Sequence, residues 1–156
     1  MTPDELVAYE PFLSYLGMRI VEATPGRAIL RLEIAAHLTN HVHGIHAGAQ
    51  YTLGESTAAM VAISLVLDQL DRVNVLTQSA TITYQRPAHG SLQAEGAIPD
   101  EARDAVVAAL ARGERATCEV PMTVSDDEGV AVTTLRVTCV LLPRRPDEQT
   151  AAVSHD

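Results

Sequence analysis

Hydrophobic and polar positions alternate with a period of two in six segments of this chain, which is the pattern of half-buried β-strands. In the segment 27–34, for example, Leu30 and Leu32 alternate with Arg31 and Glu33. Short turns rich in glycine, proline or acidic residues separate neighbouring segments. We expect strands at residues 18–23, 27–34, 74–86, 91–97, 116–124 and 130–142.

The strand expected at 74–86 has two faces of different character. One face is apolar and the other carries hydroxyl groups, as expected for a half-exposed strand whose outer face a second subunit covers. The apolar face consists of Leu76, Ala80, Ile82 and Tyr84, and the outer face of Thr77, Ser79, Thr81 and Thr83.

Three segments have the pattern of helices. Residues 47–70 are apolar on nearly every side, which predicts a long helix that is buried all round and enclosed by a sheet. A short helix is expected to start at Thr2, where a capping box begins, and to end near Gly17. Asp100 is expected to cap a third helix over 101–112, which ends at glycine.

The order of these elements predicts an α+β fold, in which one long central helix is wrapped by a curled, mostly antiparallel sheet, because four strands follow the long helix in succession. The 156 residues suit one domain, expected at 1–142, and the polar segment 143–156 is expected to be a flexible C-terminal tail. The sequence shows no signal-peptide pattern and no apolar stretch of about 20 residues, so a cytoplasmic protein is expected.

Charge and composition disfavour several classes of binding partner and of catalytic chemistry. Eleven basic residues against twenty acidic ones give a net charge of −9, which disfavours binding to nucleic acid and to anionic membranes. Aromatic residues make up only 3% of the chain, so platforms for base stacking are scarce. All the basic residues are arginine, which excludes a Schiff-base lysine and a P-loop lysine.

The two cysteines lie on the strands that flank the acidic turn at 126–129. We expect Cys118 and Cys139 to be diagonal neighbours on one side of a hairpin, where they serve as small buried hydrophobes. Their spacing allows a disulfide, but a reducing cytosol disfavours one. Neither cysteine has the spacing of a zinc or redox motif.

Most of the candidate catalytic residues lie within residues 40–55. Ala47 and Gly48 lie at the predicted start of the buried helix, where free N–H groups and the positive end of the helix dipole can polarise a carbonyl oxygen. Glu55 is the only residue of that helix before Asp68 that is charged at neutral pH. Because an unpaired carboxylate among apolar residues is costly, Glu55 is a candidate base or nucleophile.

Two motifs, one at the helix start and one after the next strand, carry a resemblance to a known family. They are Asn40-x5-His46-x-Gly48-x6-Glu55 and Tyr84-Gln85-Arg86-Pro87-x2-Gly90. With these motifs the chain resembles the hotdog-fold acyl-CoA thioesterases, nearest to the branch that includes phenylacetyl-CoA thioesterases. The resemblance extends over about residues 12–142. The chain departs from the pattern at Ala47, where the branch has glycine, and at Ala59, where some relatives have a hydroxyl group.

The resemblance implies a homo-oligomer, dimer or tetramer, that hydrolyses an acyl-CoA thioester to a free acid and coenzyme A with no metal or other cofactor. It implies that the N–H groups of Ala47 and Gly48 polarise the thioester carbonyl. Glu55 is implied to be the nucleophile or the base that activates water.

The resemblance also implies roles for residues around the helix start. Asn40 and His46 are implied to orient the thioester or the water. The turn formed by Arg86 and Pro87 is implied to lie near the coenzyme A moiety.

Other interpretations of the same residues stay open. Glu55 can be a structural residue bonded to the hydroxyl of Thr52 or Ser56, and Arg86 can be a solvated strand end. A metal site among His37, His41, His43 and His46 is disfavoured, because no cysteine or aspartate lies among them. A non-catalytic acyl-CoA-binding protein with the same fold is the main alternative function.

Helix geometry adds an expectation about assembly. Glu55 lies eight residues after Ala47, so a straight helix separates them by about 12 Å and about 80°. A thioester carbon must lie roughly 3 Å from both the attacking group and the oxyanion donor. One helix cannot meet both conditions, so we expect the active site to be shared between two chains related by a twofold axis.

Overall fold

A computed structural model describes residues 6–7 and 10–144 of the chain. Its helices are α2 (Pro11–Leu16), a short 3-10 helix (Ala36–Leu38), α3 (Ala47–Ile63) and α4 (Asp100–Ala111). Its strands are β1 (Met18–Thr24), β2 (Arg27–Leu32), β3 (Val73–Tyr84), β4 (Leu92–Ala97), β5 (Ala116–Asp126) and β6 (Ala131–Pro143). The predicted start of the first helix at Thr2 lies outside the described residues.

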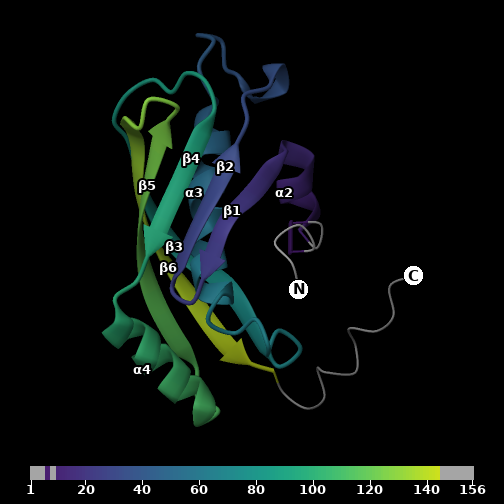
Figure 1. The fold of residues 1–156 in the computed structure, drawn as a ribbon, viewed down its shortest axis with the longest axis vertical. Coiled ribbons are helices and arrows are strands. Elements are labelled where there is room, and N and C mark those ends of the chain that lie inside the picture. The colour runs from purple at the N-terminus through teal and green to yellow at the C-terminus, as the bar shows by residue number, and fades with distance from the viewer. Residues whose placement is uncertain (1–5, 8–9, 145–156) are drawn as a thin grey trace, which may run out of the picture.

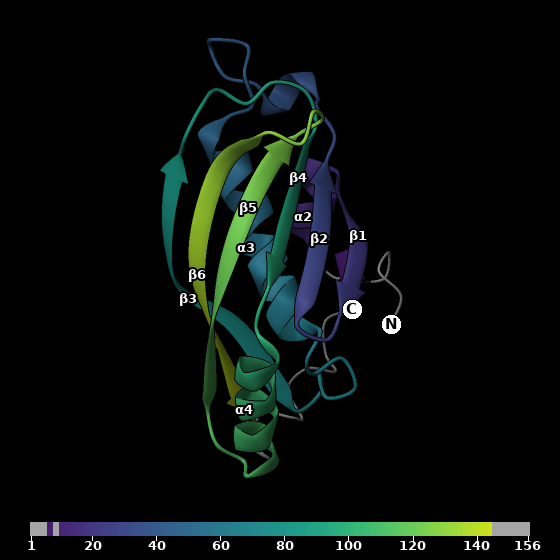
Figure 2. The ribbon, with the colours of Figure 1, turned by 60° about the vertical axis from the view of Figure 1, so that its left-hand side comes forward.

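The six strands form one open sheet in the order β1-β2-β4-β5-β6-β3, and every pairing is antiparallel. The α+β class and the antiparallel sheet predicted from the sequence are therefore confirmed. The strands β1 and β3 lie at the two edges, while α3 lies against one face of the sheet (Figures 1 and 2). Helix α4 lies beyond one end of the sheet, on the connection from β4 to β5.

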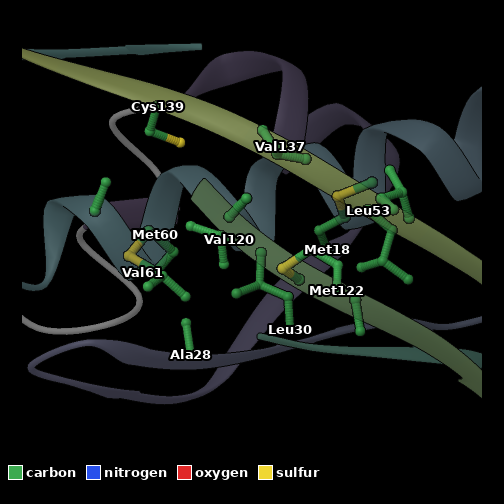
Figure 3. Close-up of a cluster of buried hydrophobic side chains, with 14 of the residues drawn as sticks. Met18, Ala28, Leu30, Leu53, Met60, Val61, Val120, Met122, Val137 and Cys139 are labelled. Atoms are coloured by element: carbon green, nitrogen blue, oxygen red, sulfur yellow. The ribbon is translucent and has the colours of Figure 1, made fainter. Parts of the chain in front are cut away.

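Helix α3 packs on the sheet through its apolar side chains and contacts all six strands. Figure 3 shows Leu53 and Val61 of α3 in one cluster with Val120 and Val137 of the sheet, and all four are fully buried. Burying a side chain of this size contributes about 1.5–3 kcal/mol to folding. This cluster fixes α3 relative to the sheet, and so fixes the polar residues at its start and its middle.

A glycine allows α3 to approach β6 closely. A Cβ atom at Gly54 would lie 2.5 Å from Cδ1 of Leu135, which is less than van der Waals contact allows. Gly54 directly precedes Glu55 in the helix. The close approach therefore determines how near the Glu55 carboxylate lies to the sheet.

Helix α3 is shorter than the sequence predicts, because it ends at Ile63 rather than near residue 70. The Ser64 hydroxyl donates to the carbonyl of Val61 at 2.6 Å and accepts the N–H of Gly26 at 3.0 Å. These bonds terminate the helix and fasten its end to the turn between β1 and β2. The apolar residues that follow are not helical, although Val66 remains fully buried.

A β-bulge changes the faces of β3 from those predicted. Thr77 pairs with Cys139, but Ser79 pairs with Thr138, so Gln78 is an extra residue on this strand. The bulge places Leu76 on the outside, where it is 53% exposed, and turns Thr77 toward α3. The prediction was correct only beyond the bulge, because a constant period of two cannot hold across an inserted residue.

The cysteines are directly opposite each other rather than diagonal. Cys118 and Cys139 are partners in the β5–β6 ladder, both are free, and both are buried. The contact with Cys118, burial and the charge of Glu55 all raise the pKa of Cys139, so this thiol stays protonated. The predicted role as small buried hydrophobes is confirmed.

The ends of two further elements also differ from the prediction. Asp100 is the first residue of α4 rather than its cap, a position that Pro99 occupies without a side-chain hydrogen bond. Strand β6 continues to Pro143, and the N–H of Arg144 donates to the carbonyl of Arg72 at 2.7 Å. The rest of the predicted tail, from residue 145, lies outside the described residues.

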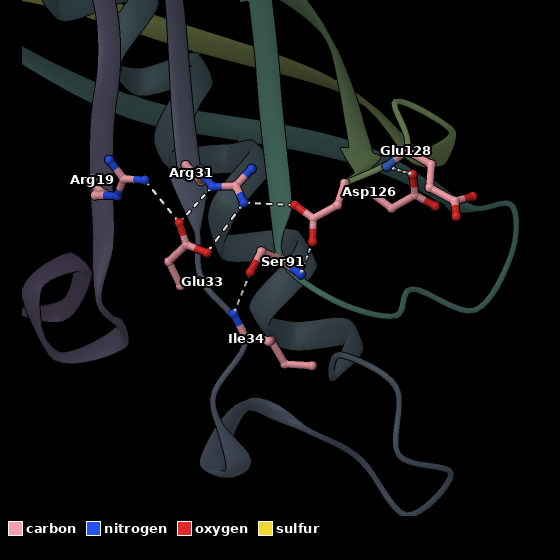
Figure 4. A network of polar contacts seen from close by, with 8 residues as sticks. Arg19, Arg31, Glu33, Ile34, Ser91, Asp126 and Glu128 are labelled. Carbon is pink, nitrogen blue, oxygen red and sulfur yellow. Dashed lines mark hydrogen bonds and ion pairs between the residues drawn. The ribbon is translucent and has the colours of Figure 1, made fainter.

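Four charged side chains form a chain of ion pairs at one end of the sheet (Figure 4). Glu33 contacts Arg19 at 2.9 Å and Arg31 at 2.7 Å, and Arg31 also contacts Asp127 at 2.7 Å. Arg31, Ser91 and Arg19 together lower the pKa of Glu33 to about 2. Since these side chains are largely in contact with solvent, each pair contributes only about 0.2–1 kcal/mol.

This ion-pair chain also holds two loops. Asp127 accepts the N–H of Ser91 at 3.0 Å, and the Ser91 hydroxyl accepts the N–H of Ile34 at 3.0 Å. Ile34 leads into the loop 35–46, and Ser91 ends the loop 85–91 that follows β3. The network therefore fastens both loops that surround the start of α3.

Candidate active site

His46 caps the start of α3. Its Nδ1 atom accepts the N–H of Gly48 at 2.9 Å, so the neutral ring carries its proton on Nε2. The Gly48 N–H is therefore already used within the chain. A role of Gly48 as a second donor to a substrate, beside Ala47, would require this bond to break.

Ala47 is the remaining donor at the start of the helix. The N–H groups of Ala49 and Gln50 both donate to the carbonyl of His46, at 3.0 and 3.1 Å. The N–H of Ala47 has no acceptor within residues 6–7 and 10–144. Because Ala47 is exposed and lies at the positive end of the helix dipole, its N–H can receive an oxygen atom from a ligand.

Asn40 shapes the loop that leads to the helix. Its Oδ1 atom accepts the N–H of Val42 at 3.1 Å and that of Gly44 at 3.0 Å. These bonds stabilise a tight turn in which His43 has a φ of 60°, a conformation that few non-glycine residues adopt. The side-chain oxygen of Asn40 is thus occupied, and only its NH2 group is available to a ligand.

The loops 35–46 and 85–91 meet at a cavity of about 420 Å³, which we call the helix-start cavity. The N–H of Ile45 donates to the carbonyl of Ala88 at 2.8 Å and joins the two loops. The lining brings together four of the residues singled out in the sequence, namely Asn40, Ala47, Arg86 and Pro87.

Arg86 gives the helix-start cavity its positive charge. It is exposed, and within the described part of the chain its guanidinium has no ion-pair partner. In a protein with a net charge of −9, an arginine without an acidic neighbour is available to an anionic ligand.

Tyr84 joins the end of β3 to the start of α3. Its hydroxyl donates to the carbonyl of Ala47 at 3.1 Å. Burial, with a smaller contribution from Tyr51, raises the pKa of Tyr84, which keeps this donor protonated. Sequence analysis placed Tyr84 on the apolar face of its strand and in a motif, but it did not identify this bond, because the bond joins residues 37 positions apart.

Glu55 lies in a second cavity of about 290 Å³, which we call the Glu55 groove. The groove runs between α2 and α3, and most of its wall is apolar. Its apolar lining residues are Phe12, Leu13, Ala59, Met60 and Ile63. A carboxylate at the side of an apolar groove can act on a bond whose neighbouring acyl group occupies the groove.

Thr77 is the hydrogen-bond partner of Glu55. Its hydroxyl donates to Oε1 of Glu55, and both residues are half-buried. The alternative partners expected from the sequence do not make this contact. Thr52 donates to the carbonyl of Gly48 at 2.9 Å, and among the described residues Ser56 makes no hydrogen bond to Glu55. Val75 and Ala80 are both apolar but are an odd number of residues apart, so a regular strand would place them on opposite faces. This spacing was the signal for the bulge that turns Thr77 inward.

The two cavities share no lining residue in one chain. The structure therefore groups Asn40, Ala47, Arg86 and Pro87, and leaves Glu55 apart. His46 and Gly48 lie at the helix start without lining either cavity. Across residues 6–7 and 10–144, the histidines and acidic residues form no group of three that could hold a metal ion.

Comparison with known proteins identifies the family. A family described as "Domain of unknown function (DUF4442)" matches residues 5–141, most of the chain. The chain belongs to the DUF4442 family. None of the described helices of this DUF4442 protein is long and apolar enough to cross a membrane.

One curated relative of this DUF4442 protein is described as an esterase. Over 89 residues the chain is 35% identical to a "putative esterase" of Halobacterium salinarum. The alignment covers 55% of this chain and 58% of that protein. The match thus spans little more than half of either protein.

Solved structures with the same fold are thioesterase-like proteins. A Pseudomonas aeruginosa protein described as a "probable thioesterase" is 24% identical, with a TM-score of 0.76 and coverage of 92% of this chain and 97% of that one. The Escherichia coli PaaI protein, from the phenylacetic acid degradation operon, is 16% identical, with a TM-score of 0.68 and 87% coverage of each chain. The resemblance to hotdog-fold thioesterases is confirmed at the level of the fold.

Proposed function

We propose that this DUF4442 protein is a cytoplasmic acyl-CoA thioesterase that hydrolyses its substrate to a free acid and coenzyme A without a metal. The observation that carries the proposal is the N–H of Ala47, which has no acceptor among the described residues and lies in one cavity with Arg86. The donor suits a thioester oxygen, and the arginine suits the phosphates of coenzyme A. In this proposal α3 is the central helix of a hotdog fold.

The reaction needs one group from each cavity. The Glu55 carboxylate takes a proton from water as the water oxygen bonds to the thioester carbon, or it attacks that carbon itself and the resulting anhydride is hydrolysed. In both routes the carbonyl oxygen becomes an oxyanion that accepts the N–H of Ala47. The carbon–sulfur bond then breaks, and coenzyme A leaves as a thiolate that takes up a proton.

Two chains supply the complete site. Because Ala47 and Glu55 lie in separate cavities of one chain, we propose that the helix-start cavity of one protomer meets the Glu55 groove of its partner. Strand β3 supports such pairing, since it is a 12-residue edge strand with unpaired backbone groups and an exposed Leu76. The assembly is a homodimer, or a tetramer built from two such dimers.

In this arrangement the acyl group occupies the Glu55 groove and the coenzyme A part lies along the helix-start cavity. The apolar wall of the groove favours an uncharged acyl group. Glu10 and Glu55 at the side of the groove repel an acyl group that carries a carboxylate of its own. Asn40 and His46 hold the loop and the helix start through the bonds described above, and thereby orient the thioester.

A substrate panel tests this proposal. The purified chain is assayed with acetyl-, hexanoyl-, decanoyl- and phenylacetyl-CoA by the release of free thiol, and the binding of each ester is measured by calorimetry. We expect turnover of at least one ester, unchanged after dialysis against a chelator. Binding without turnover of any ester would contradict the proposal and favour an acyl-CoA-binding protein.

A further inference from the structure

The hydrogen bond between Thr77 and Glu55 is a contact of the candidate site to which the family resemblance assigns no role. Thr77 donates its hydroxyl proton to Oε1 of Glu55, whereas Oε2 accepts no hydrogen bond within the described residues. One carboxylate oxygen is therefore fixed to the sheet, and the other is available at the groove.

The fold places Thr77 there by a specific device. Before the bulge the register pairs Thr77 with Cys139, and after it pairs Ser79 with Thr138. Without Gln78 as the extra residue, the strand could not keep both Thr77 and Ile82 on the face toward α3. The bulge therefore allows one threonine hydroxyl to face inward from a strand whose other serine and threonine side chains are exposed.

The Cys139 thiol is the other polar neighbour of Thr77, because it lies opposite Thr77 in the ladder and is fully buried. The contact with Cys118 and burial raise the pKa of Cys139 and keep its thiol protonated, and a protonated thiol is a weaker acceptor than the Glu55 carboxylate. Gly54 holds α3 close to the sheet one residue before Glu55. A half-buried carboxylate with one fixed hydrogen bond loses most of its freedom to rotate.

We propose that Thr77 is a positioning residue, whose hydroxyl holds one oxygen of Glu55 so that the other faces the bound thioester. This inference rests on the proposed role of Glu55. A carboxylate that rotates freely spends less time in the reactive orientation, and a misplacement of about 1 Å can cost about 100-fold in rate. The role acts on kcat, because Thr77 does not line the groove in which the acyl group binds.

The test compares Thr77→Val with Thr77→Ser, using the best ester of the panel. Valine keeps the shape of the side chain and removes the donor, so kcat should fall about 10- to 100-fold with KM unchanged. Serine restores the donor and should recover most of kcat. Thr81→Val is the matched control, because Thr81 lies on the same strand but faces outward and is exposed. It should leave both constants unchanged.

Infrared spectroscopy gives a readout that does not depend on turnover. The difference spectrum between the wild-type protein and Glu55→Gln identifies the carboxylate band of Glu55. The frequency of that band should shift in Thr77→Val, should equal the wild-type frequency in Thr77→Ser and should be unchanged in Thr81→Val. Thermal unfolding checks each variant, and Thr77→Ala replaces Thr77→Val if valine prevents folding.

The outcomes separate this inference from the proposed function. If Glu55→Gln is inactive while Thr77→Val keeps its kcat and its carboxylate band, the role of Thr77 is wrong and the proposed function stands. If Glu55→Gln remains fully active, the assignment of Glu55 is itself wrong. Losses of kcat that serine does not restore would also overturn the positioning role.

Discussion

The helix-start cavity and the Glu55 groove lie on the same helix but differ in chemistry. The helix-start cavity offers positive potential, from the Ala47 N–H, the helix dipole and Arg86. The Glu55 groove offers a carboxylate beside an apolar wall. The helix-start cavity can stabilise the negative charge that develops on a carbonyl oxygen, and the Glu55 groove holds a base or nucleophile that produces that charge. Each region therefore has the part of a hydrolytic site that the other lacks.

The two regions also differ in how they are held. The helix-start cavity is built from two loops, which are joined by the backbone hydrogen bond between Ile45 and Ala88 and fastened by the network of Figure 4. The groove depends on the packing of α3 against the sheet, with Gly54 at the closest approach and Thr77 as the polar contact. A change in one region should therefore leave the structure of the other intact, which makes the two separable by mutation.

Glu55→Gln should have the largest effect. Glutamine keeps the shape of the side chain but can neither accept a proton nor attack, so kcat should fall at least ~100-fold. Steady-state kinetics measures the loss, and circular dichroism checks that the fold is unchanged. Retention of most of kcat would contradict the role of Glu55.

Ala47→Pro should have the second largest effect, a loss of about 100- to 1,000-fold in kcat, because it removes the helix-start N–H that has no acceptor in the described part of the chain. Proline fits the first position of a helix, and the extended ψ of 138° at His46 suits the residue before a proline. Ala47→Ser keeps the N–H and is the control. Equal activity of the two variants would show that this N–H takes no part.

His46→Ala should lower kcat about tenfold and the free energy of unfolding by about 1 kcal/mol, because it removes the cap on Gly48. Asparagine is also a good cap, so His46→Asn should recover most of the stability. His37→Ala and His41→Ala should change little. Equal losses at all three histidines, reversed by zinc, would instead support a metal site.

Arg86→Gln should have the smallest effect, a rise in KM of about fivefold with kcat unchanged, since one exposed charge contributes about 1 kcal/mol and is screened by salt. An acyl N-acetylcysteamine thioester lacks the phosphates of coenzyme A, and its KM should not change. Arg115→Gln is the control, because among the residues that the structure describes Arg115 bonds only to Gln78. A rise in KM with both substrates would show that Arg86 does not bind the phosphates.

Local signals in the sequence predicted much of the fold and the residues at the helix start. Neighbours in the chain determine the alternation of Leu30 and Leu32, and the structure has a strand there. Neighbours in the chain also determine where the buried helix begins, and α3 does begin directly after His46. The contacts of Glu55 and Gly48 were not predicted. The first depends on a bulge that only the pairing of β3 with β6 creates, and the second on which atom of the His46 ring faces the backbone.

The predicted end of α3 was wrong because it, too, depends on a contact with a distant part of the chain. The apolar run continues past Ser64, so composition alone favours a longer helix. The helix ends there because Ser64 bonds both to Val61 and to the distant turn at Gly26. That second bond exists only once β1 and β2 are folded.

The most direct test of the shared site is complementation between two inactive variants. Glu55→Gln and Ala47→Pro subunits are mixed in equal amounts after reversible dissociation, and native mass spectrometry verifies the mixed dimers. A mixed dimer then holds one doubly damaged site and one intact site, so the mixture should regain about one quarter of wild-type activity while each parent stays inactive. Verified mixed dimers that remain inactive would contradict an active site shared between the two chains.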